Sequence, residues 1–352
     1  MKFLFIAPRF HTNQYGAIKG LVAQGHQVEF LARKSGRNEC YDQITPIFSE
    51  KTFLSRIKQI NIILKTYEPD IIIIRGVTLE NLAYSCISKI YTKKIILYTQ
   101  DPLYSSNRNY SRAFARKIMW NTISRVRITP VIGEVNENSF SLPHEHFIPF
   151  VVEPPSLSNE RKYFPDGHIR ILCIGKLSLE RKNHILLLKA LKDLRTNHPL
   201  KLCLLGSLSS EDNPQYVKIK DFINQNKLGD TVTIRPNIPY NSCQKEYINH
   251  DLFILPSRNE PAAVSHLEAM SYGLPVICSD TNGTKSYIEE GKNGFIFHSD
   301  NLKDLKDKII RIISNRDTLM KMGRESLTIV KEKYLPQRWH DKILKIIEQE
   351  FS

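Results

Sequence analysis

Two glutamates stand eight positions apart in the second half of the chain, at Glu260 and Glu268. The pattern predicts a buried strand that ends at Pro256 and a helix that begins near Val264. Glu260 then lies in the loop before the helix, and Glu268 lies one turn into it. Because the first amides of a helix have no intrahelical partners, they favour a phosphate at the helix start. We therefore expect the two carboxylates to bracket one ligand, with Glu260 at a sugar and Glu268 at ribose hydroxyls. The plainer interpretation, that both are ordinary acids flanking a helix, stays open at this point.

A basic loop is the second candidate for chemistry. It follows the first strand expected in the second half of the chain and contains Gly175, Lys176, Arg181 and Lys182. The glycine lets the backbone turn tightly, and the cations would lie at the carboxyl end of a strand, where a diphosphate can bind. A solvated basic loop is the alternative interpretation. Gly16 is the third candidate, because a glycine that opens a helix after the first strand permits close approach of a ligand.

Short apolar strands alternate with amphipathic helices, and the alternation restarts after a stretch rich in Pro and Ser at 149–159. Such alternation predicts right-handed crossovers and a parallel, doubly wound sheet in each half. Before this linker, the pattern predicts strands at 2–7, 27–32, 70–75, 94–99 and 127–132, and helices at 16–24 and 53–67. After it, the pattern predicts strands at 169–174, 201–205, 231–234, 252–255 and 275–278, and helices at 184–196, 216–226, 302–314, 318–333 and 338–350. In open sheets of this kind, ligands bind beyond the carboxyl ends of the strands.

The composition bounds the class of protein. A chain of 352 residues, 41% hydrophobic and 24% charged, is long enough for two α/β domains and unlike disordered or fibrous chains. No apolar run approaches the roughly 20 residues of a membrane-spanning helix. The six cysteines form no CxxC pair, which favours reduced thiols and the cytoplasm. The net charge of +14 indicates a negatively charged partner, and nucleic acid, an anionic membrane face and phosphorylated substrates all fit it.

A basic stretch at 108–120 interleaves cations with Tyr110, Phe114, Ile118 and Trp120. A basic amphipathic helix of this type lies on anionic membranes, which would suit an acceptor carried on a lipid. The sequence therefore predicts peripheral contact with the inner face of the membrane. A helix that covers the sheet and solvates its basic face is the alternative.

The second half of the chain resembles the GT-B fold retaining glycosyltransferases of family 4, also called glycosyl transferases group 1. The residues that carry the likeness are Pro256-Ser257, Glu260, Leu267-Glu268-Ala269-Met270, Gly273, Pro275-Val276, Asn282-Gly283, Ile288-Glu289 and 291–297, with Gly175, Leu177 and Lys182 in the basic loop. The likeness runs from Ile169 to Tyr334. In the first half it is thin and rests on Gly16, 25–28 and Gln100-Asp101.

The resemblance implies an α/β fold with two Rossmann-like doubly wound lobes that face each other across a cleft. An N-terminal acceptor-side domain would span 1–155, a C-terminal nucleotide-sugar-binding domain would span 156–335, and a C-terminal helix at 336–352 would pack back on the first domain. The implied activity is retaining, metal-independent transfer of a hexose-type sugar from a UDP- or GDP-linked donor. The acceptor would be a saccharide or a lipid-linked saccharide of surface polysaccharide biosynthesis. No cofactor is implied beyond the donor.

The resemblance also implies roles for single residues. Glu260 would contact the donor sugar and stabilise positive charge at its anomeric carbon, and Glu268 would bind the ribose. Asp101 would face the acceptor and activate it as a base. The residues that would hold the diphosphate are Lys176, Lys182 and the backbone around Ala263 and Val264, with Gly16 beneath the phosphate from the opposite lobe.

Three positions depart from the family pattern. Lys176 stands where arginine is usual, which keeps the charge but loses the bidentate fork. Ala263 stands where glycine is usual, and Tyr15 stands where a second glycine is common. These departures leave the identity of the donor open.

Two other functions stay open. A nucleotide-sugar epimerase or a phosphorylase could use the same scaffold, although the Glu260 and Glu268 pair in its full setting argues against both. The charge would suit a nucleic-acid-binding protein, but no helix-turn-helix, zinc or aromatic RNA-binding motif supports one, so we expect no nucleic-acid partner. We also expect no metal site, because the chain has no Asp-x-Asp in a strand–loop setting.

Overall fold

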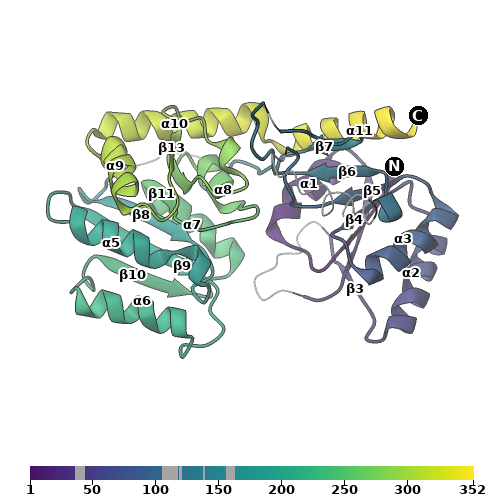
Figure 1. The fold of residues 1–352 in the computed structure, drawn as a ribbon, viewed down its shortest axis with the longest axis horizontal. Coiled ribbons are helices and arrows are strands. Elements are labelled where there is room, and N and C mark those ends of the chain that lie inside the picture. Colours follow the sequence, from purple (N-terminus) through teal and green to yellow (C-terminus); the bar gives the residue numbers. More distant parts are fainter. Residues whose placement is uncertain (36–43, 105–117, 119–120, 138, 156–162) are drawn as a thin grey trace. The chain divides into compact units, whose positions relative to one another are not determined.

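The computed structural model describes residues 1–35, 44–104, 118, 121–137, 139–155 and 163–352. The chain divides into two units (Figure 1). The first contains Met1–Val151 and Tyr334–Ser352, and the second contains Val152–Lys333. The sequence placed these divisions at 155 and 335, a few residues later in each case. The basic stretch at 108–120 lies outside the described residues, apart from Ile118, and so does 156–162 of the predicted linker.

The first unit is built on a parallel seven-stranded sheet in the order β3-β2-β1-β4-β5-β6-β7. Its strands are β1 (Lys2–Ala7), β2 (Gln27–Ala32), β3 (Ile47–Phe48), β4 (Ile71–Arg75), β5 (Ile95–Tyr98), β6 (Val126–Thr129) and β7 (Glu145–Phe147). Its described helices are α1 (Thr12–Ala23), α2 (Phe53–Tyr67), α3 (Leu79–Tyr91) and α11 (Pro336–Phe351). The strand order reverses at β1, as in a doubly wound sheet. The four isoleucines of β4 are buried, as expected for a central parallel strand.

The C-terminal helix α11 belongs to the first unit, as the resemblance implied. It packs against α1, and Gly20 makes this approach possible. A Cβ atom on Gly20 would lie only 2.4 Å from the carbonyl oxygen of Pro336. At the far end of the helix, Glu350 accepts hydrogen bonds of 2.7 Å from both His144 and His146. The two ends of the chain therefore complete one folded unit.

The second unit contains a parallel six-stranded sheet in the order β10-β9-β8-β11-β12-β13. Its strands are β8 (Ile169–Ile174), β9 (Leu200–Gly206), β10 (Val232–Pro236), β11 (Leu252–Leu255), β12 (Val276–Ser279) and β13 (Gly294–Phe297). Its α-helices are α5 (His184–Leu194), α6 (Pro214–Gln225), α7 (Cys243–Asn249), α8 (Ser265–Ser271), α9 (Leu302–Ile313) and α10 (Arg316–Lys333), and short 3-10 helices lie at η1 (Glu180–Lys182), η2 (Tyr240–Ser242) and η3 (Lys285–Tyr287). Both sheets thus have the doubly wound α/β form that the sequence predicted.

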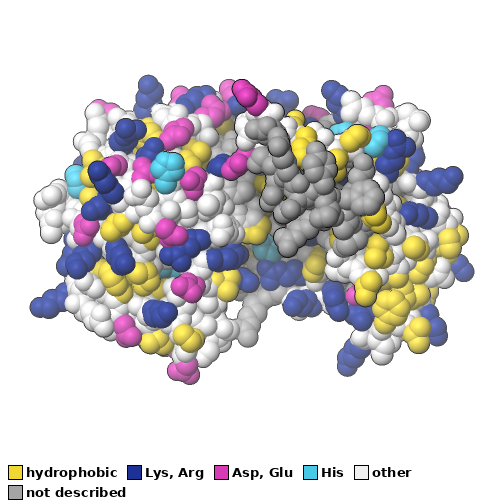
Figure 2. All heavy atoms as spheres, viewed as in Figure 1, with side chains coloured by type: hydrophobic (Ala, Val, Ile, Leu, Met, Phe, Trp, Pro, Cys, Tyr) yellow, Lys and Arg dark blue, Asp and Glu magenta, His cyan; other side chains and the backbone are white. Residues whose placement is uncertain are grey.

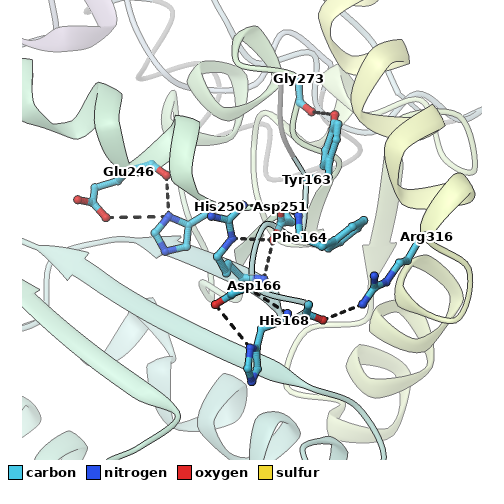
Figure 3. Close-up of polar contacts among 11 residues, drawn as sticks. Tyr163, Phe164, Asp166, His168, Glu246, His250, Asp251, Gly273 and Arg316 are labelled. Carbon is cyan, nitrogen blue, oxygen red and sulfur yellow. Dashed lines mark hydrogen bonds and ion pairs between the residues drawn. The ribbon is translucent and has the colours of Figure 1, made fainter. Parts of the chain in front are cut away.

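A buried acid anchors the start of the second unit (Figure 3). The carboxylate of Asp251 accepts hydrogen bonds from the guanidinium of Arg170 at 2.9 and 3.0 Å and from the amide of Phe164 at 3.2 Å. Nearby, the Tyr163 hydroxyl donates to the carbonyl of Gly273 at 2.9 Å. These contacts tie the segment before β8 to β11 and to the end of α8, so β8 enters the sheet at a defined position.

One sequence prediction about the first unit needs correction, and one helix was missed. Helix α1 begins at Thr12 rather than at Gly16. The ring of His11 accepts a hydrogen bond from the amide of Asn13, and the side chain of Gln14 accepts one from the amide of His11. This reciprocal cap starts the helix one turn earlier. Helix α3 was not predicted, because polar residues are mixed with the apolar ones on its inner face and apolar residues also lie on its outer face, which obscures the stripe that marks a surface helix.

Candidate active site

The glutamate and the basic loop that the sequence singled out separately meet in the second unit. Oε2 of Glu260 lies 2.6 Å from Nζ of Lys182 and 2.5 Å from Nη1 of Arg181. They meet because β8 and β11 are neighbours in a parallel sheet, so the loops after both strands leave the same edge. The Glu260 side chain is buried, whereas that of Arg181 is partly exposed. The result is one cluster in which a buried carboxylate is neutralised by two cations.

The path of the loop after β8 explains how Lys182 reaches this cluster. The loop forms the 3-10 helix η1, and Asn183 then adopts a left-handed conformation with φ of 54° before α5 begins. The Lys182 stem crosses over Gly175, where a Cβ atom would lie 3.1 Å from the Cδ atom of the lysine. The glycine therefore leaves room for the stem of the cation that holds Glu260.

The loop that carries Glu260 is fixed by backbone hydrogen bonds. The amide of Arg258 donates to the carbonyl of Arg181 at 2.7 Å, and the amide of Gly283 donates to the carbonyl of Glu260 at 2.8 Å. Glu260 also forms an isolated bridge with Asn282. The buried Nδ2 atom of Asn282 has no hydrogen-bond partner among the described residues.

Two tyrosines hold the second glutamate of the motif. The hydroxyl of Tyr240 donates to Oε1 of Glu268 at 2.9 Å, and the hydroxyl of Tyr247 donates to Oε2 at 2.8 Å. Burial raises the pKa of Glu268, and the two tyrosine hydrogen bonds oppose that rise. Tyr247 is buried and its ring stacks on that of Tyr272 at a centroid distance of 5.1 Å. Each carboxylate oxygen keeps a second lone pair for another donor.

The segment between the two glutamates begins its helix close to the predicted place. Helix α8 starts at Ser265, directly after Val264, and within the described residues no side chain caps this start. Ala263 is buried, and its carbonyl accepts the hydroxyl of Thr284 at 2.9 Å. The carbonyl of Thr284 in turn lies 3.1 Å from Nε2 of His266. Burial lowers the pKa of His266 to about 4, so its ring is neutral at pH 7 and its Nε2 can donate this bond.

The remaining predicted site residues are placed as follows. Lys176 is exposed and follows Gly175 at the carboxyl end of β8. Gly16 lies inside α1, where a Cβ atom would be 2.1 Å from the carbonyl oxygen of Val151. The close neighbour that requires glycine there is thus the first unit's own backbone. Asp101 follows β5, and its carbonyl accepts the hydroxyl of Thr129 at 2.7 Å. Gly16 and Asp101 both belong to the first unit, whereas the glutamate cluster belongs to the second.

Sequence reasoning missed the tyrosines of this site. Tyr240 lies on η2 and Tyr247 on α7, and both elements precede β11. Neither element was predicted from the sequence. Tyr247 had one available signal: it lies five positions before the predicted strand that begins at Leu252. An aromatic residue at that distance is equally typical of an ordinary core position, so no spacing rule marks it as a partner of Glu268.

One group of three side chains in the described part of the chain could in principle hold a metal ion: Cys203, Glu246 and His250. Its surroundings oppose that use. Arg235 forms an ion pair with the Glu246 carboxylate, and burial raises the pKa of the Cys203 thiol to about 12, which disfavours the thiolate. Nδ1 of His250 lies 2.6 Å from the carbonyl oxygen of Glu246 (Figure 3). These contacts account for the group without an ion.

Residues 158–327 match the family described as glycosyl transferases group 1. Spore coat protein SA of Bacillus subtilis is 32% identical over 184 residues, which cover 51% of this chain and 48% of that protein. The chain thus matches about half the length of this relative. An uncharacterized glycosyltransferase of Haemophilus influenzae is 22% identical over 87% of both chains.

Solved structures show the same fold across the whole chain. A glycosyltransferase from Rickettsia africae superposes with a TM-score of 0.77 at 18% identity, over 100% of this chain and 99% of the other. The Anabaena protein HepE, crystallised in complex with UDP, superposes with a TM-score of 0.75 at 16% identity, over 99% and 100% of the two chains. No helix among the described residues is long and apolar enough to cross a membrane. The architecture is therefore that of GT-B glycosyltransferases, with two Rossmann-like α/β lobes.

Proposed function

We propose that this chain is a retaining glycosyltransferase of family 4 that moves a hexose-type sugar from a UDP- or GDP-linked donor to a saccharide or lipid-linked acceptor. The observation that carries the proposal is the contact of Glu260 with Lys182 and Arg181 at the carboxyl edge of the second sheet. This edge is where doubly wound sheets bind ligands. The match of residues 158–327 to the group 1 family supports the same activity.

The chemistry of sugar transfer suits such a cluster. Cleavage of the bond between sugar and phosphate leaves a diphosphate with growing negative charge and an anomeric carbon with positive charge. Fixed cations stabilise the first without reorganising during the reaction, and a carboxylate stabilises the second. Lys182 and the exposed Lys176 would hold the diphosphate, together with the amides around Ala263 and Val264. Because lysines can neutralise the leaving group, the proposed mechanism needs no metal.

Glu260 would act at the donor sugar. Its contact with two cations holds the carboxylate at the edge of the sheet. When a diphosphate arrives, Lys182 and Arg181 gain a second anionic partner, and Oε1 of Glu260 is left for sugar hydroxyls. Glu268 would receive the ribose hydroxyls on the lone pairs that Tyr240 and Tyr247 do not use.

The acceptor side of the proposal rests on the family resemblance alone. Asp101 would activate the acceptor hydroxyl as a base, and Gly16 would lie near the donor phosphate. The configuration at the anomeric carbon would be retained, and the product would enter surface polysaccharide biosynthesis. Asp101→Asn tests the base: turnover should fall at least about a hundredfold. Near-normal turnover would remove Asp101 from the mechanism.

The geometry of the site gives no specific support to the alternative functions left open by the sequence. An epimerase or a phosphorylase would also bind a sugar phosphate. Transfer of the sugar to a saccharide or lipid-linked acceptor with release of nucleoside diphosphate separates a transferase from both. A nucleic-acid-binding protein would need exposed cations along a groove, whereas Lys182 of this cluster is largely buried against a carboxylate. We therefore keep the glycosyltransferase as the proposed function.

A calorimetric titration of the full chain with a panel of UDP- and GDP-sugars tests the donor site. Wild type should bind at least one of these donors. Lys182→Ala should lower the affinity for that donor about a hundredfold, because it removes a charge-assisted contact. Lys189→Ala is the matched control, because Lys189 is an exposed lysine of the neighbouring helix α5. The proposal fails if no donor binds at millimolar concentration, or if both variants bind like wild type. The anomeric configuration of the product, read by nuclear magnetic resonance, tests retention.

A further inference from the structure

Helix α3 of the first unit contacts the core through Tyr84, Leu82 and Ile87, but it also buries polar side chains and exposes large apolar ones. Its buried residues are Asn81, Tyr84, Ser85 and Ser88. On the opposite stripe, Leu79 is 85% exposed and Ile90 is 79% exposed, and the exposed Cys86 lies between them. The outer face of a surface helix normally carries polar or charged residues instead. The outer face of α3 is therefore apolar where water would favour polar residues.

The inner polar face of α3 is held in this orientation by hydrogen bonds. The side-chain amide of Asn81 donates to the carbonyls of Arg75 and Gly76 at 3.0 and 2.8 Å. The hydroxyl of Ser85 donates to the carbonyl of Ile123 at 2.5 Å. A rotation of the helix that buried Leu79 and Ile90 would break these bonds. The folded structure of the first unit therefore holds the apolar stripe on the outer side of α3.

Helix α2 extends this face with a mixed stripe. Leu54, Lys58, Ile62 and Lys65 recur at intervals of three and four residues and so lie on one side of the helix. Leu54 is 73% exposed, and Ile62 is 59% exposed. Helices α2 and α3 lie side by side in Figure 1 and pack against each other. Figure 2 shows hydrophobic side chains gathered in this region, with Lys and Arg side chains around them.

The charge on this face is positive. Glu80 is the acid within α2 and α3, and it is already engaged by Arg56 at 3.5 Å and by Arg33 at 3.6 Å. Lys58 and Lys65 are exposed among the apolar residues. Three exposed acids, Glu50, Glu68 and Asp70, flank α2, and the exposed lysines at 51, 58, 65, 89, 93 and 94 outnumber them. An anionic partner is therefore favoured over a neutral or cationic one.

We propose that the α2–α3 face, defined by Leu54, Lys58, Ile62, Lys65, Leu79 and Ile90, docks the first unit on an anionic phospholipid surface. Lysine is depleted from the cores of protein–protein interfaces. At a lipid surface, by contrast, apolar tips insert while lysine stems reach the headgroups. The proposal goes beyond the transferase activity and does not depend on it. It uses none of the residues in the basic stretch at 108–120.

Sedimentation with lipid vesicles tests this surface on the full chain without any nucleotide. Wild type should bind vesicles of phosphatidylcholine that contain about one-third phosphatidylglycerol, and should bind pure phosphatidylcholine vesicles at least about tenfold more weakly. Leu79→Ser with Ile90→Ser, and separately Lys58→Glu with Lys65→Glu, should each lower binding to the anionic vesicles about tenfold or more. Raised salt should weaken binding of wild type and should matter less for the charge-reversed variant.

Matched controls lie on the second unit. Val217→Ser with Ile248→Ser changes two exposed apolar residues, and Lys218→Glu with Lys245→Glu changes two exposed lysines. Both pairs should leave vesicle binding within about twofold of wild type. Circular dichroism and nucleoside diphosphate binding confirm that each variant is folded. The proposal is overturned if wild type does not bind anionic vesicles at low salt, or if the variants of the α2–α3 face and the control variants bind them equally well. It is also overturned if the face variants abolish a dimer in sedimentation velocity but leave vesicle binding intact.

Discussion

Nζ of Lys182 lies 2.6 Å from Oε2 of Glu260, although 78 positions separate the two residues in the chain. The proposed function assigns the lysine to the leaving diphosphate and the glutamate to the donor sugar. Their contact means that the two roles share one electrostatic unit. A change in either side chain therefore alters the charge that the other one meets.

Glu260→Gln should separate binding from turnover. The amide removes the negative charge opposite the anomeric carbon, so kcat should fall about 10²–10³-fold. Binding of the nucleoside diphosphate should stay the same or tighten, because Lys182 and Arg181 no longer share their charge with a carboxylate. Glu180→Gln, at an exposed acid of the same loop, serves as the control. Wild-type kcat in Glu260→Gln would exclude Glu260 from the chemistry.

Tyr247→Phe should lower the affinity for the donor more than Tyr240→Phe does. Tyr247 is buried, so no water replaces its hydrogen bond to Glu268, whereas Tyr240 lies on an accessible turn. Loss of the buried bond costs about 1–3 kcal/mol, or roughly 5- to 150-fold in Kd. The measurement is the ratio of Kd values for a nucleoside diphosphate and its 2′-deoxy analogue. Tyr216→Phe, at a buried tyrosine of α6, is the control. An unchanged ribose preference in Tyr247→Phe would contradict the role of Glu268.

Gly16→Ala distinguishes a structural glycine from one that contacts the donor. The new methyl group would meet the carbonyl of Val151, so the free energy of unfolding should fall by about 1–3 kcal/mol. Gly229→Ala is the control, because a Cβ atom there meets no atom within 4 Å. Denaturant unfolding gives the stability and calorimetry gives the donor affinity. A stable Gly16→Ala with a raised donor Kd would show that the structural explanation is wrong and would support contact with the phosphate.

Acid should destabilise the second unit through its buried histidines. Burial, with a smaller contribution from Lys182, lowers the pKa of His184 from 6.5 to about 4, and burial lowers that of His266 similarly. The unfolded chain therefore takes up these protons near pH 6.5, whereas the folded chain takes them up only near pH 4. Stability is complete above pH 6.5 and falls as the pH decreases through this window, by up to about 3 kcal/mol for each histidine.

His184→Leu tests this assignment. Neither ring nitrogen of His184 has a hydrogen-bond partner among the described residues, so leucine should preserve the packing and reduce the acid sensitivity. Denaturant unfolding at pH 7 and pH 4.5 measures the difference. The half-buried His198 supplies the control variant His198→Leu. Equal loss of stability between the two pH values in His184→Leu and wild type would show that another group is responsible.

The sequence by itself determined the class of fold and the position of the glutamate motif. Strand and helix periods are local properties, so most strands of both sheets lie close to their predicted ranges, and α8 begins next to Val264. The loops after β8 and β11 could be expected at one sheet edge, because parallel strands place their carboxyl ends together. Helix α3 could not be predicted in this way, because its inner face mixes polar and apolar residues and its outer face exposes Leu79 and Ile90.

Only the tertiary structure decided which side chains meet. The contact of Glu260 with Lys182 and the capture of Glu268 by Tyr240 and Tyr247 join segments that no local period relates. The same holds for Gly16. A side chain at this position is excluded by the backbone of Val151, and not by the turn that the sequence suggested. The physical reason is that a period reports which face of an element is buried. The partner on that face depends on how distant elements pack.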